Sequence, residues 1–161
     1  MGILKVDNID LNDKKTIRVV RQTIQDLVSE SSYFTLSFKP EYYFEVPNGT
    51  LPSEGGWYII LDSDVDPIYV GKADNLNKRL NTTNGSLDNF ANKTRPSDPE
   101  RNFIKKLAEL GFMSRLGVCI ITEKDLCRSL NLGRLSDVDR GNVEKFINIH
   151  RGSLSFRQTL D

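Results

Sequence analysis

The chain of 161 residues is long enough for one compact domain and too short for two comfortable ones. Hydrophobic residues make up 38% and charged residues 27%, with a mean hydropathy of −0.41, a composition that excludes a disordered or membrane-embedded chain. No apolar run approaches the roughly 20 residues that cross a bilayer. The first residues also lack the apolar core of a signal peptide, so we expect a cytoplasmic protein.

The charge is balanced in total but unevenly distributed. There are 22 basic and 22 acidic side chains, and a net charge of zero argues against a strong nucleic-acid binder. Residues 54–68 carry four acids and no basic residue, whereas residues 71–115 carry nine basic residues against five acids. The second segment therefore offers a local basic surface of the kind that binds phosphate, although a solvated helix face gives the same excess.

Hydrophobic periodicity predicts a mixture of helices and strands along the chain. In chain order we expect a helix over 13–30, two extended pieces or a hairpin over 31–47, and strands over 57–62 and 68–71 joined as a hairpin. A short helix over 73–80, a surface loop over 83–100 and a helix over 101–112 come next. The last part should form a strand over 114–123, helical stretches over 124–133 and 136–152, and a short edge strand within 153–161. This order indicates a single α+β domain over 1–161. Residues 1–53 would be a helix and strand extension packed on a core of residues 54–161.

Residue content excludes several common catalytic and metal sites. His150 is the only histidine, which excludes two-histidine zinc sites and HExxH hydrolases, and its helical position favours packing over metal binding. Cys119 and Cys127 are expected as reduced core residues rather than a disulfide or metal pair. The Gly71-Lys72 pair lacks the upstream glycine of a phosphate-binding P-loop, because position 66 is aspartate.

One stretch, residues 56–80, carries a specific succession of short motifs. Gly-Trp-Tyr at 56–58 opens a strand, and Tyr69 of a Tyr-Val-Gly triplet follows Tyr58 by eleven residues. Lys72, the pair Asn75-Leu76 and Arg79 come next, with the arginine ten residues after Tyr69. Each triplet is unspecific alone, but their order and spacing together resemble the GIY-YIG nuclease superfamily.

The resemblance implies a fold, an activity and a metal ion. The family's fold is a small three-stranded antiparallel sheet flanked by helices, and a glutamate on a late helix binds one divalent ion. Glu144, within Asn-Val-Glu-Lys-Phe-Ile, matches that glutamate, and the expected ion is Mg²⁺ or Mn²⁺. The implied activity is hydrolysis of phosphodiester bonds in DNA.

The resemblance also assigns roles to single side chains. Tyr58 is the leading candidate for positioning or deprotonating the attacking water, with Tyr69 in support. Arg79 offers a forked and permanent positive charge to the phosphate, and Lys72 can share that task. Trp57 alternates with Tyr58 and is expected to pack on the opposite side of the strand. Further residues expected to contact the substrate are Gly71, Lys78, Thr83, Asn84 and Gln158, with Asn148 as an alternative to Gln158.

One position departs from the family's pattern. Many members carry a histidine or tyrosine four residues after the motif arginine, and this chain has Thr83 there. Lys72 or another tyrosine (Tyr33, Tyr42 or Tyr43) then compensates, or the activity is reduced. The departure leaves the identity of the general base open.

The short chain leaves no room for a separate DNA-binding domain, so specificity would come from residues 1–53 and the 83–100 loop. This compactness favours a small restriction- or phage-type endonuclease, and palindromic sites would favour a homodimer. Two other interpretations stay open. The chain can be a catalytically silent GIY-YIG-like module that binds nucleic acid or protein, or an unrelated α+β interaction domain with an accidental motif.

Overall fold

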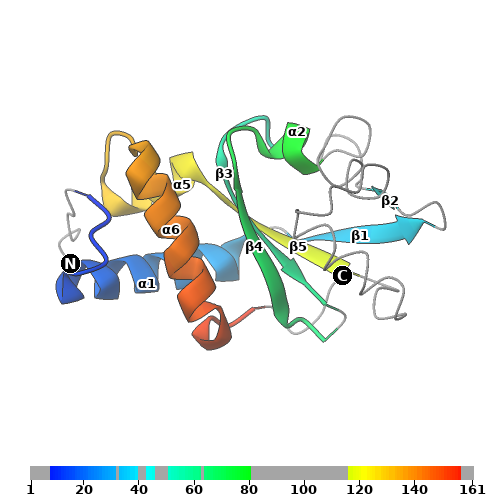
Figure 1. Ribbon diagram of the computed structural model, residues 1–161, viewed down its shortest axis with the longest axis horizontal. Coiled ribbons are helices and arrows are strands. Elements are labelled where there is room, and N and C mark those ends of the chain that lie inside the picture. The colour runs from blue at the N-terminus through cyan, green and yellow to red at the C-terminus, as the bar shows by residue number, and fades with distance from the viewer. Residues whose placement is uncertain are drawn as a thin grey trace, which may run out of the picture.

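The fold is built on one antiparallel sheet, whose strand order is β2-β1-β5-β3-β4 (Figure 1). The computed structural model describes residues 8–31, 33–39, 43–45, 51–62, 64–80 and 116–156, with the backbone alone at 33–39, 43–45, 79, 80 and 116. The strands are β1 (Tyr33–Lys39), β2 (Tyr43–Glu45), β3 (Gly56–Leu61), β4 (Pro67–Ala73) and β5 (Leu116–Thr122). The strands β5, β3 and β4 form the expected three-stranded sheet, and packed helices complete the predicted α+β fold.

The hairpin predicted from residues 31–47 extends this sheet. Strand β1 pairs with β2 and, on its other edge, with β5, where Phe34 lies opposite Val118. The two sequence regions on either side of residue 53 therefore share one sheet.

Four helices accompany the sheet among the described residues: α1 (Lys14–Glu30), α2 (Leu76–Leu80), α5 (Glu123–Leu130) and α6 (Asp137–His150), and the last is followed by the short 3-10 helix η1 (Arg151–Ser153). Asp13 caps α1 by accepting from the backbone N–H of Lys15. Ser136 and Asp139 form a reciprocal capping box at the start of α6. These caps explain why the helices begin within a residue or so of the predicted positions.

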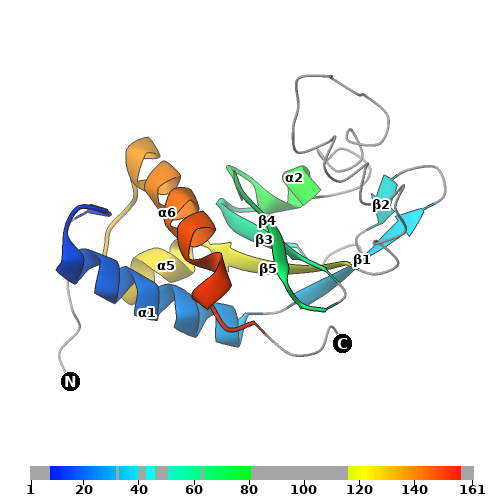
Figure 2. The ribbon, with the colours of Figure 1, turned by 60° about the horizontal axis from the view of Figure 1, so that its bottom comes forward.

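Side chains along each strand alternate between the two faces of the sheet, and the large helices pack on only one of these faces. Trp57, Ile59 and Leu61 of β3 belong to the main hydrophobic core with residues of α1, α5 and α6. Tyr58 and Ile60 are also buried but project to the other face. In both ribbon views α1, α5 and α6 gather on one side of the sheet, and α2 lies apart from them (Figures 1 and 2). We call the side of Trp57 the helix face and the side of Tyr58 the tyrosine face.

Several smaller predictions can be compared with the structure. The two cysteines are buried thiols, as expected, and the His150 ring packs on Phe146 with the ring centroids 4.4 Å apart. The predicted 83–100 loop and 101–112 helix lie outside the described residues. Within 153–161, the described part up to Phe156 contributes to η1 and then leaves it without joining a strand, so the edge strand is not formed there. No helix in the described ranges is both long and apolar enough to span a membrane.

Candidate functional site

The two motif tyrosines and the motif glycine form a cluster across the β3–β4 hairpin. Tyr58 lies opposite Gly71, and Tyr69 lies opposite Ile60 two residues further along β3. All of these positions project to the tyrosine face, because cross-strand partners share a face and so do residues two apart. The rings of Tyr58 and Tyr69 are 6.0 Å apart between centroids and inclined by 31°. The two motif tyrosines are therefore neighbours on one face of the hairpin.

Gly71 is required by the packing of the Tyr58 ring. A Cβ atom added to Gly71 would lie 2.3 Å from Cζ and 2.4 Å from the hydroxyl oxygen of Tyr58. These separations are far inside van der Waals contact, so the ring lies across the bare Cα. Gly71 of Tyr-Val-Gly thus leaves the space that the ring of Tyr58 of Gly-Trp-Tyr occupies.

The two tyrosines differ in their access to solvent. Tyr58 is 1% exposed, whereas Tyr69 is half-buried. A group that takes a proton from water must be reached by that water. Of the pair, the half-buried Tyr69 can meet this condition, whereas Tyr58 is shielded from solvent.

Helix α2 starts on the tyrosine face, at the Gly56 end of the hairpin. A Cβ on Gly56 would project toward this face and would lie 3.0 Å from the Cδ1 atom of Leu76, which is fully buried. The start of α2 is anchored by the backbone N–H of Leu76, which donates to the carbonyl of Glu54, and by Asn75, whose side chain accepts from the N–H of Lys78. The backbone of Arg79 therefore belongs to a helix on the same face as the tyrosine pair, while its side chain lies outside the described residues.

Lys72 and Glu144 belong to the other side of the hairpin. Lys72 is exposed and lies opposite Trp57, so it projects to the helix face. The indole N–H of Trp57 donates to the carbonyl of Arg140 at 3.2 Å, one helical turn before Glu144 on α6. Helix α6 lies beside the edge strand β4 (Figure 1). Lys72 and the helix that carries Glu144 thus lie on the helix face, whereas Tyr58 and Tyr69 project to the opposite face.

The surroundings of Glu144 separate it from the core. Its neighbours Val143, Phe146 and Ile147 are buried, whereas Glu144 itself is half-buried. Among the described residues its carboxylate forms no ion pair, and no group of three histidine, cysteine or acidic side chains is arranged to hold a metal. A cation at Glu144 would therefore have one carboxylate from the described chain and would take its other ligands from water or substrate.

An arginine that the sequence did not single out holds α6 in place. Arg140 donates from Nε and Nη2 to the two carboxylate oxygens of Glu123, each at 3.1 Å, and from Nη1 to Asp137 at 2.7 Å. The hydrogen bonds that Arg140 donates to Glu123 are the main cause that raises the pKa of Arg140. In the sequence, only the three-residue spacing of Asp137 and Arg140 indicated an ion pair, because Glu123 lies on another helix.

The structure thus brings together Tyr58, Tyr69 and Gly71, and it places α2 on their face. Exposed Lys78 lies on the same helix. Thr83, Asn84 and Gln158 lie outside the described residues, as do Tyr42 and the side chains of Tyr33 and Tyr43. Asn148 is exposed on α6 and accepts a hydrogen bond from Arg151 of η1. Convergence of Tyr58, Arg79 and Glu144 on one point stays a prediction.

Comparison with known proteins leaves the chain without an assigned relative. No family model matches it, and neither a curated protein nor a solved structure matches it.

Proposed function

We propose that this chain is a metal-dependent DNA endonuclease of the GIY-YIG type. The observation that carries the proposal is the cluster of Tyr58, Tyr69 and Gly71, in which the glycine of one motif admits the ring of the other. The motif arginine follows on α2, which starts on the same face. A purely structural pair of strand aromatics has no need of a basic helix at that place.

The residues present fit a magnesium ion better than the other common metals. Mg²⁺ is bound by few protein carboxylates, keeps several waters and accepts phosphate oxygens as ligands. Glu144 offers one carboxylate that is not neutralised by an ion pair among the described residues. The same set is too poor in ligands for structural zinc or for a calcium cage. Mg²⁺, or Mn²⁺ with the same ligand preference, is the ion we propose.

The chain's own groups divide the work of phosphodiester hydrolysis. Tyr69 is only half-buried, so its hydroxyl would orient the attacking water and take its proton, with the buried Tyr58 ring beside it. The guanidinium of Arg79 would bind the oxygens of the reacting phosphate, on which negative charge increases. Glu144 would hold the ion, which supplies Lewis-acid stabilisation of the leaving oxygen. This division exchanges the roles expected from sequence for the two tyrosines, because the burial of Tyr58 limits its contact with water.

The substrate we propose is DNA, cut in a restriction-like manner in the cytoplasm. Lys78 is exposed on α2, so it suits a contact with the sugar-phosphate chain, whereas Gly71 is buried against the ring of Tyr58 and acts through that ring. A homodimer would place one active site on each strand of a palindromic site.

One observation favours a second candidate function, a catalytically silent binding module. Glu144 lies on a helix that packs on the helix face, whereas the tyrosine pair occupies the other face. A module that binds DNA or protein through the tyrosine face needs no glutamate nearby. DNA retention without cleavage would select this candidate.

Nicking of supercoiled plasmid with Mg²⁺, and with EDTA in its place, tests the proposal. We expect magnesium-dependent cleavage that falls by about a hundredfold or more in Tyr69→Phe, Arg79→Ala and Glu144→Gln, since each removes a group that acts in the transition state. Asp137→Asn is the matched control, because Asp137 lies on the same helix as Glu144 and its side chain is 97% exposed. Cleavage in EDTA, or cleavage that survives all three substitutions, would overturn the assignment.

A further inference from the structure

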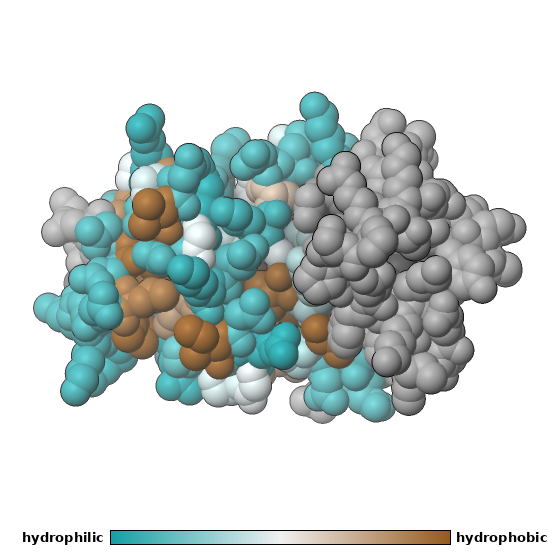
Figure 3. Space-filling model, viewed as in Figure 1, coloured by the Kyte–Doolittle hydropathy of each residue, from teal (hydrophilic) through white to brown (hydrophobic). Residues whose placement is uncertain are grey.

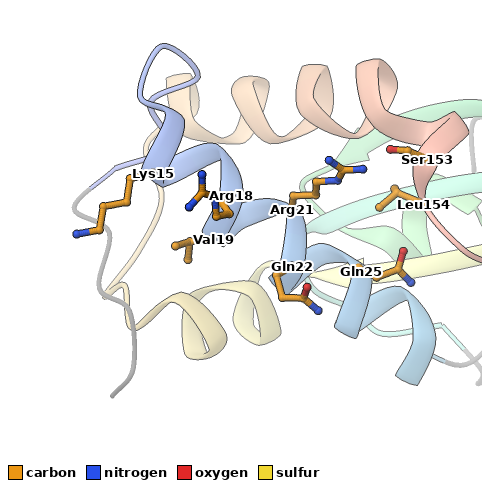
Figure 4. A pocket seen from close by; sticks show the side chains of 8 residues that line it. All are labelled: Lys15, Arg18, Val19, Arg21, Gln22, Gln25, Ser153 and Leu154. Atoms are coloured by element: carbon orange, nitrogen blue, oxygen red, sulfur yellow. The ribbon is translucent and has the colours of Figure 1, made fainter. Parts of the chain in front are cut away.

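A groove runs along the exposed side of α1, away from the sheet. Its volume is about 680 Å³, and its walls come from α1 and from the segment at the end of η1 (Figure 4). The lining residues are Lys15, Arg18, Val19, Arg21, Gln22, Gln25, Ser153 and Leu154. The amide of Gln25 fixes the second wall, since it accepts from the backbone N–H of Ser155 at 2.8 Å and donates to the carbonyl of Ser155 at 3.1 Å. Both walls of the groove are therefore held in place by the fold, one by α1 itself and the other by the hydrogen bonds of Gln25.

Positive charge dominates this groove. Lys14, Lys15, Arg18 and Arg21 occupy the first turns of α1, all four are exposed, and none forms an ion pair within the described residues. Arg18 and Arg21 are one turn apart and lie near the middle of the exposed side, and the guanidinium of Arg21 extends toward Ser153 and Leu154 (Figure 4). Cations gathered in this way repel one another, and an anion bound among them relieves that repulsion.

The acidic residues of this segment that the structure describes do not line the groove. Asp13 accepts from the hydroxyl of Thr16 at 2.7 Å and from the backbone of Lys15 at 3.2 Å, and so serves as the helix cap. Asp26 accepts from the side-chain amide of Gln22 near the other end of the groove. The charge of the central arginines thus stays available to a ligand.

The shape and surroundings of the groove select the class of anion. Guanidinium groups bind phosphate oxygens in a forked geometry, and a row of cations along a helix suits a chain of phosphates better than a single one. A membrane-binding helix would carry large exposed apolar residues beside its cations. Within the part of the chain that the structure describes, the exposed large hydrophobic residues are instead Val138 and Ile149, both on α6, and the brown patches of Figure 3 are interrupted by hydrophilic residues.

We propose that the α1 groove binds the phosphate backbone of DNA. The groove lies beyond α1 on the helix face, so the DNA segment it holds is separate from the segment at the tyrosine face. The identity of the polymer rests on the proposed function, whereas the preference for phosphate rests on the arginines. Substrate would thus be held on both sides of the sheet, and the α1 contact would be independent of sequence.

Binding of a short labelled DNA duplex in EDTA tests this, measured by fluorescence anisotropy at several salt concentrations. We expect Arg18→Gln/Arg21→Gln to weaken binding by about tenfold or more. The slope of log affinity against log salt should become shallower by about 1.8, since each lost phosphate contact removes about 0.9. Arg18→Lys/Arg21→Lys should keep most of the slope because it keeps the charge. If the glutamine variant does not fold, Lys14→Gln/Lys15→Gln in the exposed first turn replaces it.

The control is Arg128→Gln/Arg134→Gln, which removes the same charge from exposed positions outside the groove. Equal affinity and salt slope in the groove variant and this control would overturn the inference, and so would absence of DNA binding by the unaltered chain. Binding of a mononucleotide as tightly as the duplex, or of anionic vesicles in place of DNA, would also overturn it. Groove-dependent binding without plasmid cleavage would support the groove while the nuclease proposal fails. Plasmid cleavage together with DNA binding that does not depend on the groove would support the nuclease proposal and overturn the groove proposal.

Discussion

Replacing Gly71 with alanine places a methyl group where the Tyr58 ring lies. The added Cβ would be 2.3 Å from Cζ of that ring, and ordinary carbon contact begins near 3.5 Å, so the two must separate by roughly 1 Å. Tyr58 is 1% exposed and has no solvent to move into. Overpacking of this kind costs about 1–3 kcal/mol, and the stiffer alanine backbone returns about 0.5–1 kcal/mol of that. We expect Gly71→Ala to lower the free energy of unfolding by about 1–2 kcal/mol.

Urea denaturation followed by circular dichroism measures this loss. An m-value equal to that of the unaltered chain would show that the substitution changes only the free energy of unfolding. Gly141→Ala is the matched control, because a Cβ at that helical position meets nothing within 4 Å. It should stabilise the chain by about 0.5–1 kcal/mol through helix propensity. Tyr58→Leu removes the clashing atoms, so Gly71→Ala should cost less in that background. A loss in Gly71→Ala below about 0.5 kcal/mol, or strict additivity with Tyr58→Leu, would refute the packing described for the cluster.

Three further substitutions probe other parts of the fold. Gly56→Ala should be more severe than Gly71→Ala and prevent folding at 37 °C, because its Cβ would lie 2.2 Å from the backbone oxygen of Ile121; soluble expression with a native melting transition would contradict this. Glu123→Gln should cost about 1–2 kcal/mol in urea denaturation by breaking the forked bonds to its arginine partner, whereas Asp137→Asn should change little, and equal effects of the two would count against the fork. Burial raises the pKa of the Cys127 thiol above its ordinary value of 9.0, so the unfolded chain ionises first and stability falls as pH rises past that value; Cys127→Ala should lose that part of the pH dependence, and identical profiles would speak against it.

Local features of the chain were predictable because each is encoded within a few residues. The helix predicted over 13–30 forms as α1 (Lys14–Glu30), and the hairpin predicted from 57–62 and 68–71 forms as β3 and β4. The alternation of Trp57 and Tyr58 placed the indole and the phenol on opposite faces, which the structure confirms. Period and capping decide such features without reference to the rest of the fold.

What the sequence did not predict depends on contacts between distant segments. The pairing of β1 with β5 joins residues about eighty apart in the chain, and no local pattern records it. The burial of Tyr58 and the half-exposure of Tyr69 also follow from packing, so periodicity alone could not rank the two hydroxyls. The bonds from Arg140 to Glu123 join two helices whose relative position the tertiary structure determines. Candidate site residues could thus be named from sequence, whereas their faces and access needed the structure.

The hydrogen bond from Trp57 to Arg140 gives the protein a built-in optical reporter. Trp57 is the single tryptophan of the chain, and its buried indole is tied to the helix that carries Glu144. All tryptophan fluorescence therefore originates at the junction of β3 and α6. Water that enters when α6 separates from the sheet would shift that emission to longer wavelength, so the docking of the glutamate's helix can be followed in the unlabelled protein.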